Sequence, residues 1–277
     1  MVVNYQNLKS TANSIRHGIL KSVHAAGSGH PGGSLSAVEI LTVLYFYKMN
    51  IDPQNPQKPD RDRFVLSKGH AAPVLYSTLA ERGYFEKEKL VTLRKVGSML
   101  QGHPDMKRVP GVDMSTGSLA QGFSAGIGMA LAGKLDKSSR RIYTLLGDGE
   151  LQEGLIWEAA MSGAHYKLNN LTAILDFNGL QIDGPNDKVM SIKPVNEKWK
   201  SFGWYVIEID GHSFEDIIEA LDEAETVKDR PTIIIAKTIK GKGVSYMENN
   251  PDWHGKAPDN ELTEKAILEL GGAEDVR

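Results

Sequence analysis

The chain has 277 residues, and its 32 Lys and Arg against 35 Asp and Glu give a formal net charge of −3. This near balance, without a basic block, argues against nucleic acid or an anionic membrane as a partner. The absence of cysteine excludes disulfides, zinc–thiolate sites and a cysteine nucleophile. Residues 1–10 are polar without a signal-like apolar core, and the most apolar stretch, 35–49, is too short to span a bilayer, so we expect a soluble cytoplasmic protein.

Helical patterns open the chain. An amphipathic helix is predicted over about 4–26, and the glycine-rich loop 27–33 ends it. Ser36 and Glu39 have the spacing of a capping box, which predicts that a second helix begins there. A short strand is expected at 64–67, followed by another helix.

The middle of the chain alternates loop, strand and helix. Residues 97–121 are rich in Gly, Pro and Ser and long for a connection without regular structure, which is typical of a functional loop. A helix of small residues is predicted at 121–134 and is expected to pack tightly. Strands are then predicted at 142–146 and 171–177, with a helix from 151 to about 167 between them.

The last part repeats this pattern, with a strand at 204–209, a helix capped by Ser213, and a strand at 232–238. Several of the strands are continuous apolar runs, which is typical of a parallel sheet covered on both faces. No internal repeat or linker is visible. The sequence therefore predicts a single three-layer α/β/α domain over residues 1–277, with a mainly parallel central sheet.

Polar residues stand directly after two of these strands. Gly147-Asp148-Gly149 follows one, and Asn178 follows the other. A strand–helix–strand unit closes right-handed, and neighbouring strands lie about 5 Å apart, so Asp148 and Asn178 can offer two oxygens to one Mg²⁺. Gly149, at the expected start of the helix, lets a phosphate approach backbone amides. Asp-Gly alone is a common turn pair, but this setting favours a metal–diphosphate site.

Four of the eight histidines lie in glycine-containing loops: His30, His70, His103 and His254. Loops at strand ends are where α/β proteins place their sites, and imidazoles there suit hydrogen bonding to phosphate and hydroxyl oxygens and proton transfer near neutral pH. The other four are interpreted as structural or surface residues: His17, His24 and His165 in helical stretches, and His212 in a turn.

These loops together resemble transketolase. Gly147-Asp-Gly149 followed by Asn178 is similar to the signature of all thiamine-diphosphate enzymes. The narrower similarity runs from about residue 10 to 260 and is carried by Ser28-Gly-His-Pro-Gly32, Ser67-Lys-Gly-His70, Gly102-His-Pro104, Ser115-Thr-Gly-Ser-Leu-Ala-Gln-Gly122, Leu151-Gln-Glu-Gly154 and His254-Gly255.

The resemblance implies the thiamine-diphosphate fold of that family and a role for each matching position. Mg²⁺, or Ca²⁺ or Mn²⁺ in its place, would be held by Asp148, Asn178 and the carbonyl of Leu180. The cofactor would be bound by His70, Gly117, Ser118, Leu119, Gly147, Asp148, Gly149, Glu150, Asn178, Leu180 and His254. The catalytic positions would be His30, His103, His254 and Glu153, of which Glu153 points toward a dimer interface.

Two departures from the family pattern matter. Ser118 and Ala120 stand where the family often has Pro and Gly, and the loop is expected to keep its form. A full transketolase is more than twice as long, so the pyrimidine-binding and C-terminal domains are expected on a separate chain, in a heterotetramer with two copies of each.

The implied activity is transfer of a two-carbon ketol unit between sugar phosphates, as in the pentose phosphate pathway. Within enzymes, 1-deoxyxylulose-5-phosphate synthase, the α subunit of a 2-oxo-acid dehydrogenase, and a relative acting on an unusual ketose stay open. Outside enzymes, a scaffolding or regulatory subunit is the alternative, although a scaffold needs neither the metal nor the histidine positions.

Overall fold

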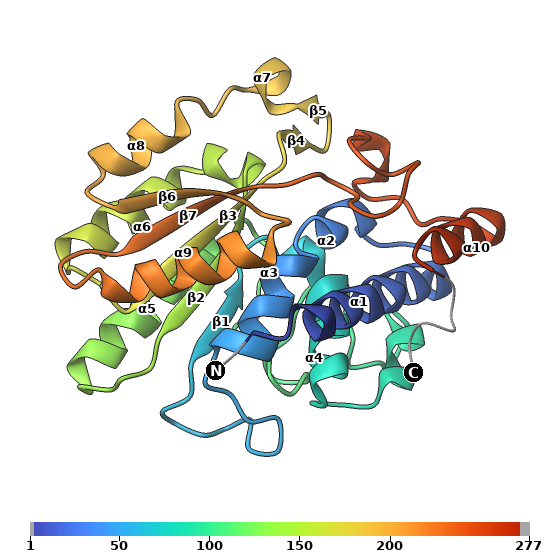
Figure 1. Ribbon diagram of the computed structural model, residues 1–277, viewed down its shortest axis with the longest axis horizontal. Coiled ribbons are helices and arrows are strands. Elements are labelled where there is room, and N and C mark those ends of the chain that lie inside the picture. Colours follow the sequence, from blue (N-terminus) through green and yellow to red (C-terminus); the bar gives the residue numbers. More distant parts are fainter. Residues whose placement is uncertain (1–2, 272–277) are drawn as a thin grey trace.

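In the computed structural model, which describes residues 3–271, a five-stranded sheet crosses the middle of the molecule (Figure 1). Its strand order is β1-β2-β3-β7-β6, and every neighbouring pair is parallel. The strands are β1 (Arg63–Leu66), β2 (Ile142–Gly147), β3 (Leu171–Phe177), β6 (Tyr205–Asp210) and β7 (Thr232–Lys237). The predicted parallel sheet is confirmed.

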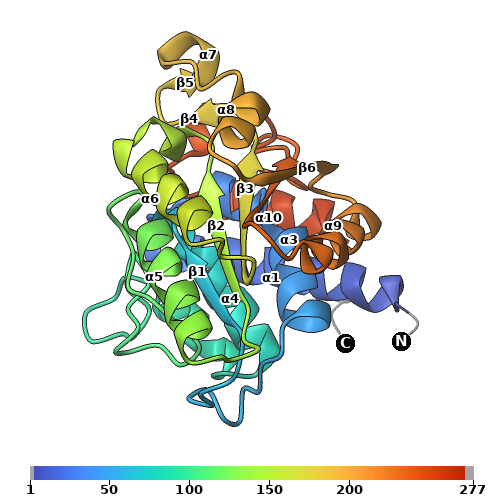
Figure 2. The same ribbon diagram turned by 90° about the vertical axis from the view of Figure 1, so that its left-hand side faces the viewer.

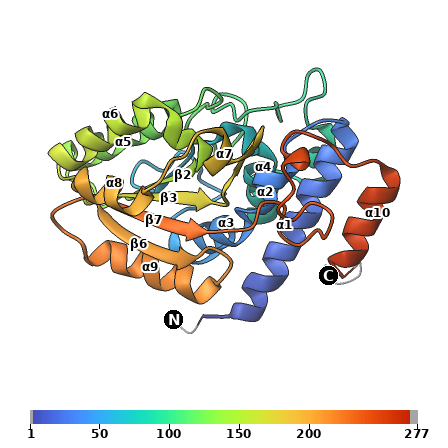
Figure 3. The ribbon, with the colours of Figure 1, turned by 90° about the horizontal axis from the view of Figure 1, so that it is seen from above.

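Helices cover both faces of the sheet, as Figure 3 shows. One face packs on α1 (Tyr5–Ala26), α3 (Val38–Val43), α4 (Ala72–Arg82) and α9 (Phe214–Thr226); the other packs on α5 (Gln121–Leu135), α6 (Gly154–His165) and α8 (Val195–Ser201). Side chains of β2 alternate between the two cores, with Tyr143 and Leu145 in the first and Ile142 and Leu146 in the second. This alternation explains the continuous apolar runs, and the three-layer prediction is confirmed.

Shorter elements surround the carboxyl end of the sheet. The ribbon β4–β5 and the helix α7 project beyond β3 (Figure 2). The remaining elements are α2 (Pro31–Leu35), η1 (Leu44–Lys48), η2 (Gly69–Ala71), η3 (Lys87–Thr92), β4 (Leu180–Gln181), β5 (Gly184–Pro185), α7 (Asn186–Val189), η5 (Pro251–Trp253) and α10 (Asn260–Glu269). Within residues 3–271, no helix combines the length and the apolar character that a membrane crossing needs.

The helix starts agree with the sequence at two places. Asn4 caps α1 by accepting a hydrogen bond from the Asn7 amide at 3.0 Å. Ser213 caps α9 by accepting one from the Asp216 amide at 3.2 Å. Both caps use the short polar side chains that satisfy free amides at helix N-termini.

The predicted capping box at Ser36 and Glu39 is wrong. The helix α3 begins at Val38 without a side-chain cap. The Ser36 hydroxyl donates to the Asp176 carboxylate at 2.5 Å, and Glu39 accepts a hydrogen bond from Arg16 at 2.6 Å. Both side chains are drawn into tertiary contacts that the local spacing cannot reveal.

The predicted helix from 151 to about 167 is also corrected. The segment starts with a four-residue 3-10 turn, η4 (Gly149–Gln152), and α6 begins only at Gly154. Gly149 therefore does not stand at the N-terminus of a long α-helix. Its amide donates to the Asp148 carboxylate at 2.8 Å, and the full dipole of α6 does not reach it.

Candidate active site

The carboxyl ends of β2 and β3 meet at one cavity of about 330 Å³. In the parallel register Gly147 lies opposite Asp176, so the residues after each strand emerge at the same edge of the sheet. The cavity is lined by most of the predicted site residues: His30, His70, Gly117, Leu119, Gly147, Asp148, Gly149, Glu150, Glu153, Asn178, Leu180 and His254. The predicted strand–helix–strand unit thus gathers loops that are distant in the sequence.

Asp148 is the buried acid of this cavity, with 2% of its surface exposed. Its carboxylate accepts hydrogen bonds from the Gly149 amide at 2.8 Å and the Gly179 amide at 2.5 Å. Burial, and then the charge of Asp176, raise the pKa of Asp148 to about 6. A buried carboxylate with a raised pKa is a position that a cation would stabilise.

Oxygen atoms of the right kind for a hard cation stand beside Asp148. Asn178 Oδ1 accepts the Leu180 amide at 3.1 Å, and the Leu180 carbonyl faces the cavity region, where Lys240 Nζ lies 3.2 Å away. Asn186 is 3% exposed, and neither polar atom of its side chain has a hydrogen-bond partner.

Carboxylate, amide and carbonyl oxygens are the ligands that Mg²⁺ accepts. Among residues 3–271, no three His, Cys, Asp or Glu side chains form a metal-binding group. A cation here would therefore depend on amide, carbonyl and ligand oxygens as well as Asp148. The donor set fits a Mg²⁺–diphosphate and does not fit a metal held by protein side chains alone.

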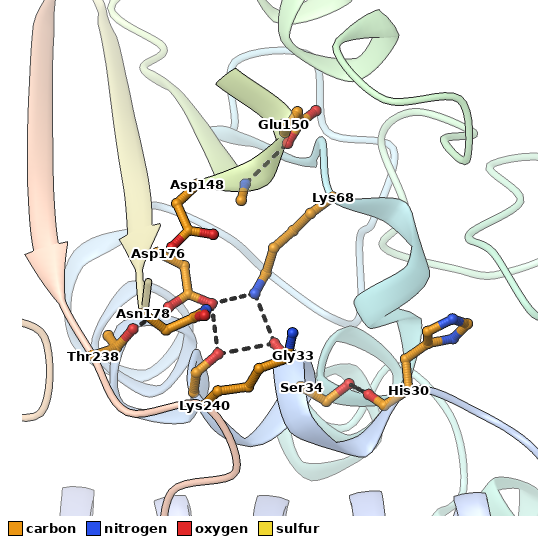
Figure 4. Close-up of polar contacts among 12 residues, drawn as sticks. His30, Gly33, Ser34, Lys68, Asp148, Glu150, Asp176, Asn178, Thr238 and Lys240 are labelled. Carbon is orange, nitrogen blue, oxygen red and sulfur yellow. Dashed lines mark hydrogen bonds and ion pairs between the residues drawn. The ribbon is translucent and has the colours of Figure 1, made fainter. Parts of the chain in front are cut away.

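A buried ion pair that the sequence analysis missed forms the floor of the site (Figure 4). Lys68 and Asp176 are 2% and 0% exposed and contact each other directly. Asp176 also accepts hydrogen bonds from Ser36 and Thr238, and Lys68 Nζ donates to the Gly33 carbonyl at 2.7 Å. The pKa of Asp176 lies below its ordinary value; burial alone would raise it, and the Lys68 charge with the three donors outweighs that effect.

A second buried lysine, Lys240, approaches from the loop after β7. It is 2% exposed, and its Nζ lies 2.8 Å from His254 Nδ1. Burial is the main reason that the pKa of Lys240 is lowered to about 8. Lys68 and Lys240 together bring two cations to the cavity, which suits a diphosphate.

Three of the four predicted loop histidines form a cluster. The ring centroids of His30, His70 and His254 lie 5.1–5.5 Å apart. Burial, followed by neighbouring cations, lowers the pKa of His30 to about 4 and that of His254 to about 3, and places the pKa of His70 well below its ordinary value. These rings are therefore neutral hydrogen-bonding groups at neutral pH.

His103 is exposed and is not among the residues that line the cavity. The absent Cβ of Gly117 would stand 3.4 Å from the His103 ring, so the two predicted positions are neighbours. Burial, and then Arg94, lower the pKa of His103. Ser118 is exposed and is not among the residues that line the cavity.

Glu150 connects three segments of the chain at the cavity. It is 2% exposed and accepts hydrogen bonds from the Ser67 hydroxyl at 2.5 Å, the Ala120 amide at 2.7 Å and the Gly147 amide at 2.9 Å. Both carboxylate oxygens are thus engaged with three segments of the chain. Glu153, in contrast, is exposed at the end of η4 and lines the cavity.

The sequence contained signals for the residues that were missed. Lys68 lies inside the Ser67-Lys-Gly-His70 motif, and Asp176 is the single charged residue of the strand predicted at 171–177. A lone acid in a buried strand needs a partner, because burying an unpaired charge is very costly. Lys240 follows the last strand at the same sheet edge, where a cation was not expected.

Comparison with known proteins agrees with this geometry. Residues 8–274 match the family model described as "Transketolase, thiamine diphosphate binding domain". The chain therefore belongs to the transketolase family of enzymes. It corresponds to the thiamine diphosphate binding domain of these enzymes.

Individual relatives are similar over nearly the whole chain. It is 47% identical to the 6-deoxy-6-sulfo-D-fructose transketolase subunit of Clostridium sp. (strain MSTE9), covering 95% of this chain and 96% of that protein. It is 45% identical to one of the apulose-4-phosphate transketolase subunits of Phocaeicola vulgatus, covering 98% and 95%. The crystal structure of the Campylobacter jejuni transketolase superimposes with a TM-score of 0.92 at 35% identity, and there the chain spans 43% of the longer protein.

Proposed function

We propose that this chain is the diphosphate-binding subunit of a two-subunit transketolase, which transfers a two-carbon ketol unit from a ketose phosphate to an aldose phosphate. The observation that carries the proposal is the single cavity where Asp148, Asn178 and the His30–His70–His254 cluster meet. Two relatives of nearly the same length are named as transketolase subunits, which supports an enzymatic role over a scaffolding one.

Thiamine diphosphate, when bound, supplies the carbanion chemistry that cleaves and forms the carbon–carbon bonds. Asp148, Asn178 and the Leu180 carbonyl would ligate its Mg²⁺, and Gly149, His70, His254, Lys68 and Lys240 would surround the diphosphate. Gly117 and Leu119 would line the thiamine end of the cavity. His30 and His103 would meet the oxygen atoms of the sugar at the mouth.

A second chain would complete the active site. We infer that it carries the pyrimidine-binding domain and that two copies of each subunit form a heterotetramer. The subunit names of the two same-length relatives support a partner chain. The exposed Glu153 at the cavity border is the residue of this chain that we assign to that contact.

The names of the relatives bear on the identity of the ketose donor. The two same-length relatives are named for different ketoses, a sulfonated fructose and apulose 4-phosphate. This difference favours an unusual ketose as the second candidate beside the common pentose phosphates.

Reconstitution tests the proposal. The chain is purified with a candidate partner chain and assayed with Mg²⁺, thiamine diphosphate and an aldose phosphate acceptor. Xylulose 5-phosphate, 6-deoxy-6-sulfo-fructose, apulose 4-phosphate and pyruvate are compared as donors. Turnover of a ketose supports a transketolase and names its donor, whereas turnover of pyruvate alone would replace it with a 1-deoxyxylulose-5-phosphate synthase. Cofactor binding without turnover of any donor would favour a regulatory subunit.

A further inference from the structure

Two rings of the histidine cluster each turn Nδ1 toward a cation. Lys240 Nζ lies 2.8 Å from His254 Nδ1, and an Arg94 guanidinium nitrogen lies 3.4 Å from His30 Nδ1. Ammonium and guanidinium groups carry only hydrogen-bond donors. In both pairs the ring nitrogen must therefore be the acceptor, which places the proton of a neutral ring on Nε2.

We propose that Lys240 and Arg94 are positioning residues that hold His254 and His30 as neutral rings protonated on Nε2, so that each ring presents an N–H donor to substrate oxygens. The contact of these N–H groups with a substrate rests on the proposed function, whereas the protonation state of the rings does not. The two rings would then stabilise negative charge on oxygen instead of accepting a proton at Nε2.

The Lys240–His254 pair is the more rigid of the two. Lys240 is 2% exposed, and its ammonium has a second acceptor in the Leu180 carbonyl at 3.2 Å. These two acceptors, on two different residues, fix the direction of the Lys240 side chain. The ammonium cannot turn away from the ring without losing both contacts.

Arg94 is held beside His30 by an unusual backbone. Its φ is 59°, in the left-handed region that few residues other than glycine adopt, and its amide donates to the Leu100 carbonyl at 2.7 Å. Such strain is found where the surrounding structure imposes a conformation, often at functional sites. No carboxylate within residues 3–271 forms an ion pair with Arg94, so its charge is directed to the ring and to the Ser28 hydroxyl at 3.5 Å.

Gly102 leaves room for the Arg94 guanidinium. A Cβ on Gly102 would lie 3.1 Å from Arg94 Nε and would push the guanidinium. The absence of this carbon lets the cation stay beside the His30 ring.

The chemical consequence concerns the division of labour in the site. An N–H donor aimed at an oxygen that gains charge lowers the barrier of that step. A ring whose Nε2 carries the proton has no lone pair left at that nitrogen, and its remaining lone pair, on Nδ1, faces a cation. The group that removes a proton from a substrate hydroxyl is then neither His30 nor His254 acting through Nε2.

Nitrogen NMR of the complete chain tests the proposal without cofactor or partner. Long-range ¹H–¹⁵N spectra at pH 7.5, where an ordinary imidazole is mostly neutral, distinguish a protonated from an unprotonated ring nitrogen. We expect protonated Nε2 and unprotonated Nδ1 in His254 and His30. His24 is the internal control, because its Nδ1 lies 3.2 Å from the Pro258 carbonyl, which can only accept, and it must show the opposite pattern. Protonated Nδ1 in His254 or His30 would overturn the assignment.

Variants then test the two cations. Lys240→Met keeps the length of the side chain and removes the donor, so the signals of His254 should shift to a mixture of the two tautomers. Lys240→Arg restores a donor and should restore the wild-type pattern, and Gly102→Ala should disturb His30 only. An unchanged His254 spectrum in Lys240→Met would refute the role of Lys240. The wild-type spectrum decides the tautomers even if a variant does not fold, and absence of cofactor binding in the complex would contradict the proposed function alone.

Discussion

At the scale of single residues, Asp148 shows how a functional position is kept at a cost to the fold. Its carboxylate is buried, and its two hydrogen bonds from backbone amides do not compensate for burial and for the neighbouring Asp176, so its pKa rises to about 6. A group whose folded pKa lies above its ordinary value destabilises the fold once it ionises. A bound divalent cation would reverse that effect.

The pH dependence of stability tests this account. As pH rises from 4 to 7 the unfolded chain loses the Asp148 proton earlier than the folded chain, so the free energy of unfolding should fall, by up to about 3 kcal/mol. Asp148→Asn removes this titration. In metal-free urea unfolding, the variant should gain stability relative to the wild type between pH 4 and 7. Curves that run parallel across this range would contradict the raised pKa.

Ala120 is a residue whose backbone conformation is unfavourable. Its φ is 68°, in the left-handed region, at the start of α5. Transketolases often have glycine at the matching position. The Ala120 amide donates to the buried Glu150 carboxylate at 2.7 Å, which holds the residue in this conformation. The conformation costs an alanine about 1 kcal/mol.

Ala120→Gly should therefore raise the free energy of unfolding, by roughly 0.5–1 kcal/mol after the entropy that glycine adds to the unfolded chain. Chemical denaturation measures the change. Ala132→Gly, at an exposed helical position in α5, is the matched control and should lower stability by about 1 kcal/mol. Loss of stability in both variants would show that position 120 is not strained.

At the scale of elements, the site depends on a junction of β3, β7, α2 and the segment after β1. Asp176 joins them by accepting from Lys68, Ser36 and Thr238. Such a buried pair adds little net stability compared with apolar packing, but breaking it leaves a buried charge without a partner. Its role is to fix the position of the Lys68 ammonium at the cavity.

Asp176→Ala should cost about 3–5 kcal/mol of stability, because Lys68 stays buried and unpaired. Urea denaturation at pH 7 measures it. The control is Asp187→Ala, which breaks the exposed pair with Lys193 at 2.5 Å and should lower stability far less, because exposed ion pairs contribute little. Similar costs for the two variants would mean that Lys68 finds another partner or is solvated.

At the scale of the whole molecule, two of the assigned site residues are exposed. Glu153 lines the cavity, and His103 lies beside Gly117, a residue of the cavity wall. We expect these residues to act only when a partner chain covers the cavity. Tests of the roles of His103 and Glu153 therefore need the complex of both chains.

His103→Ala in the complex should reduce turnover by about 100-fold, the typical effect of losing one oxyanion donor, and should leave thiamine diphosphate affinity close to the wild type. Steady-state kinetics and calorimetry separate the two effects. Asp148→Ala is the contrasting variant, because it should abolish Mg²⁺-dependent cofactor binding. A His103→Ala complex that no longer binds the cofactor would contradict the assigned role.

Local patterns determined much of this protein. The apolar runs predicted a parallel sheet because both of its faces are buried, and Gly147-Asp148-Gly149 with Asn178 predicted where the cavity lies because parallel strands end at one edge. Three of the four loop histidines line that cavity because their loops meet at the same edge. The start of α6 was misplaced, since a 3-10 turn and an α-helix have the same local composition.

Only the tertiary structure decided which charges meet. Lys68 contacts Asp176 across 108 positions of the sequence, and Lys240 reaches both the Leu180 carbonyl and His254. These contacts depend on strand order and on loops folding over the sheet edge, and no spacing rule encodes them. The sequence by itself therefore predicted the kind of chemistry, and the tertiary structure decided the positions and the charged neighbours of the groups proposed to carry it out.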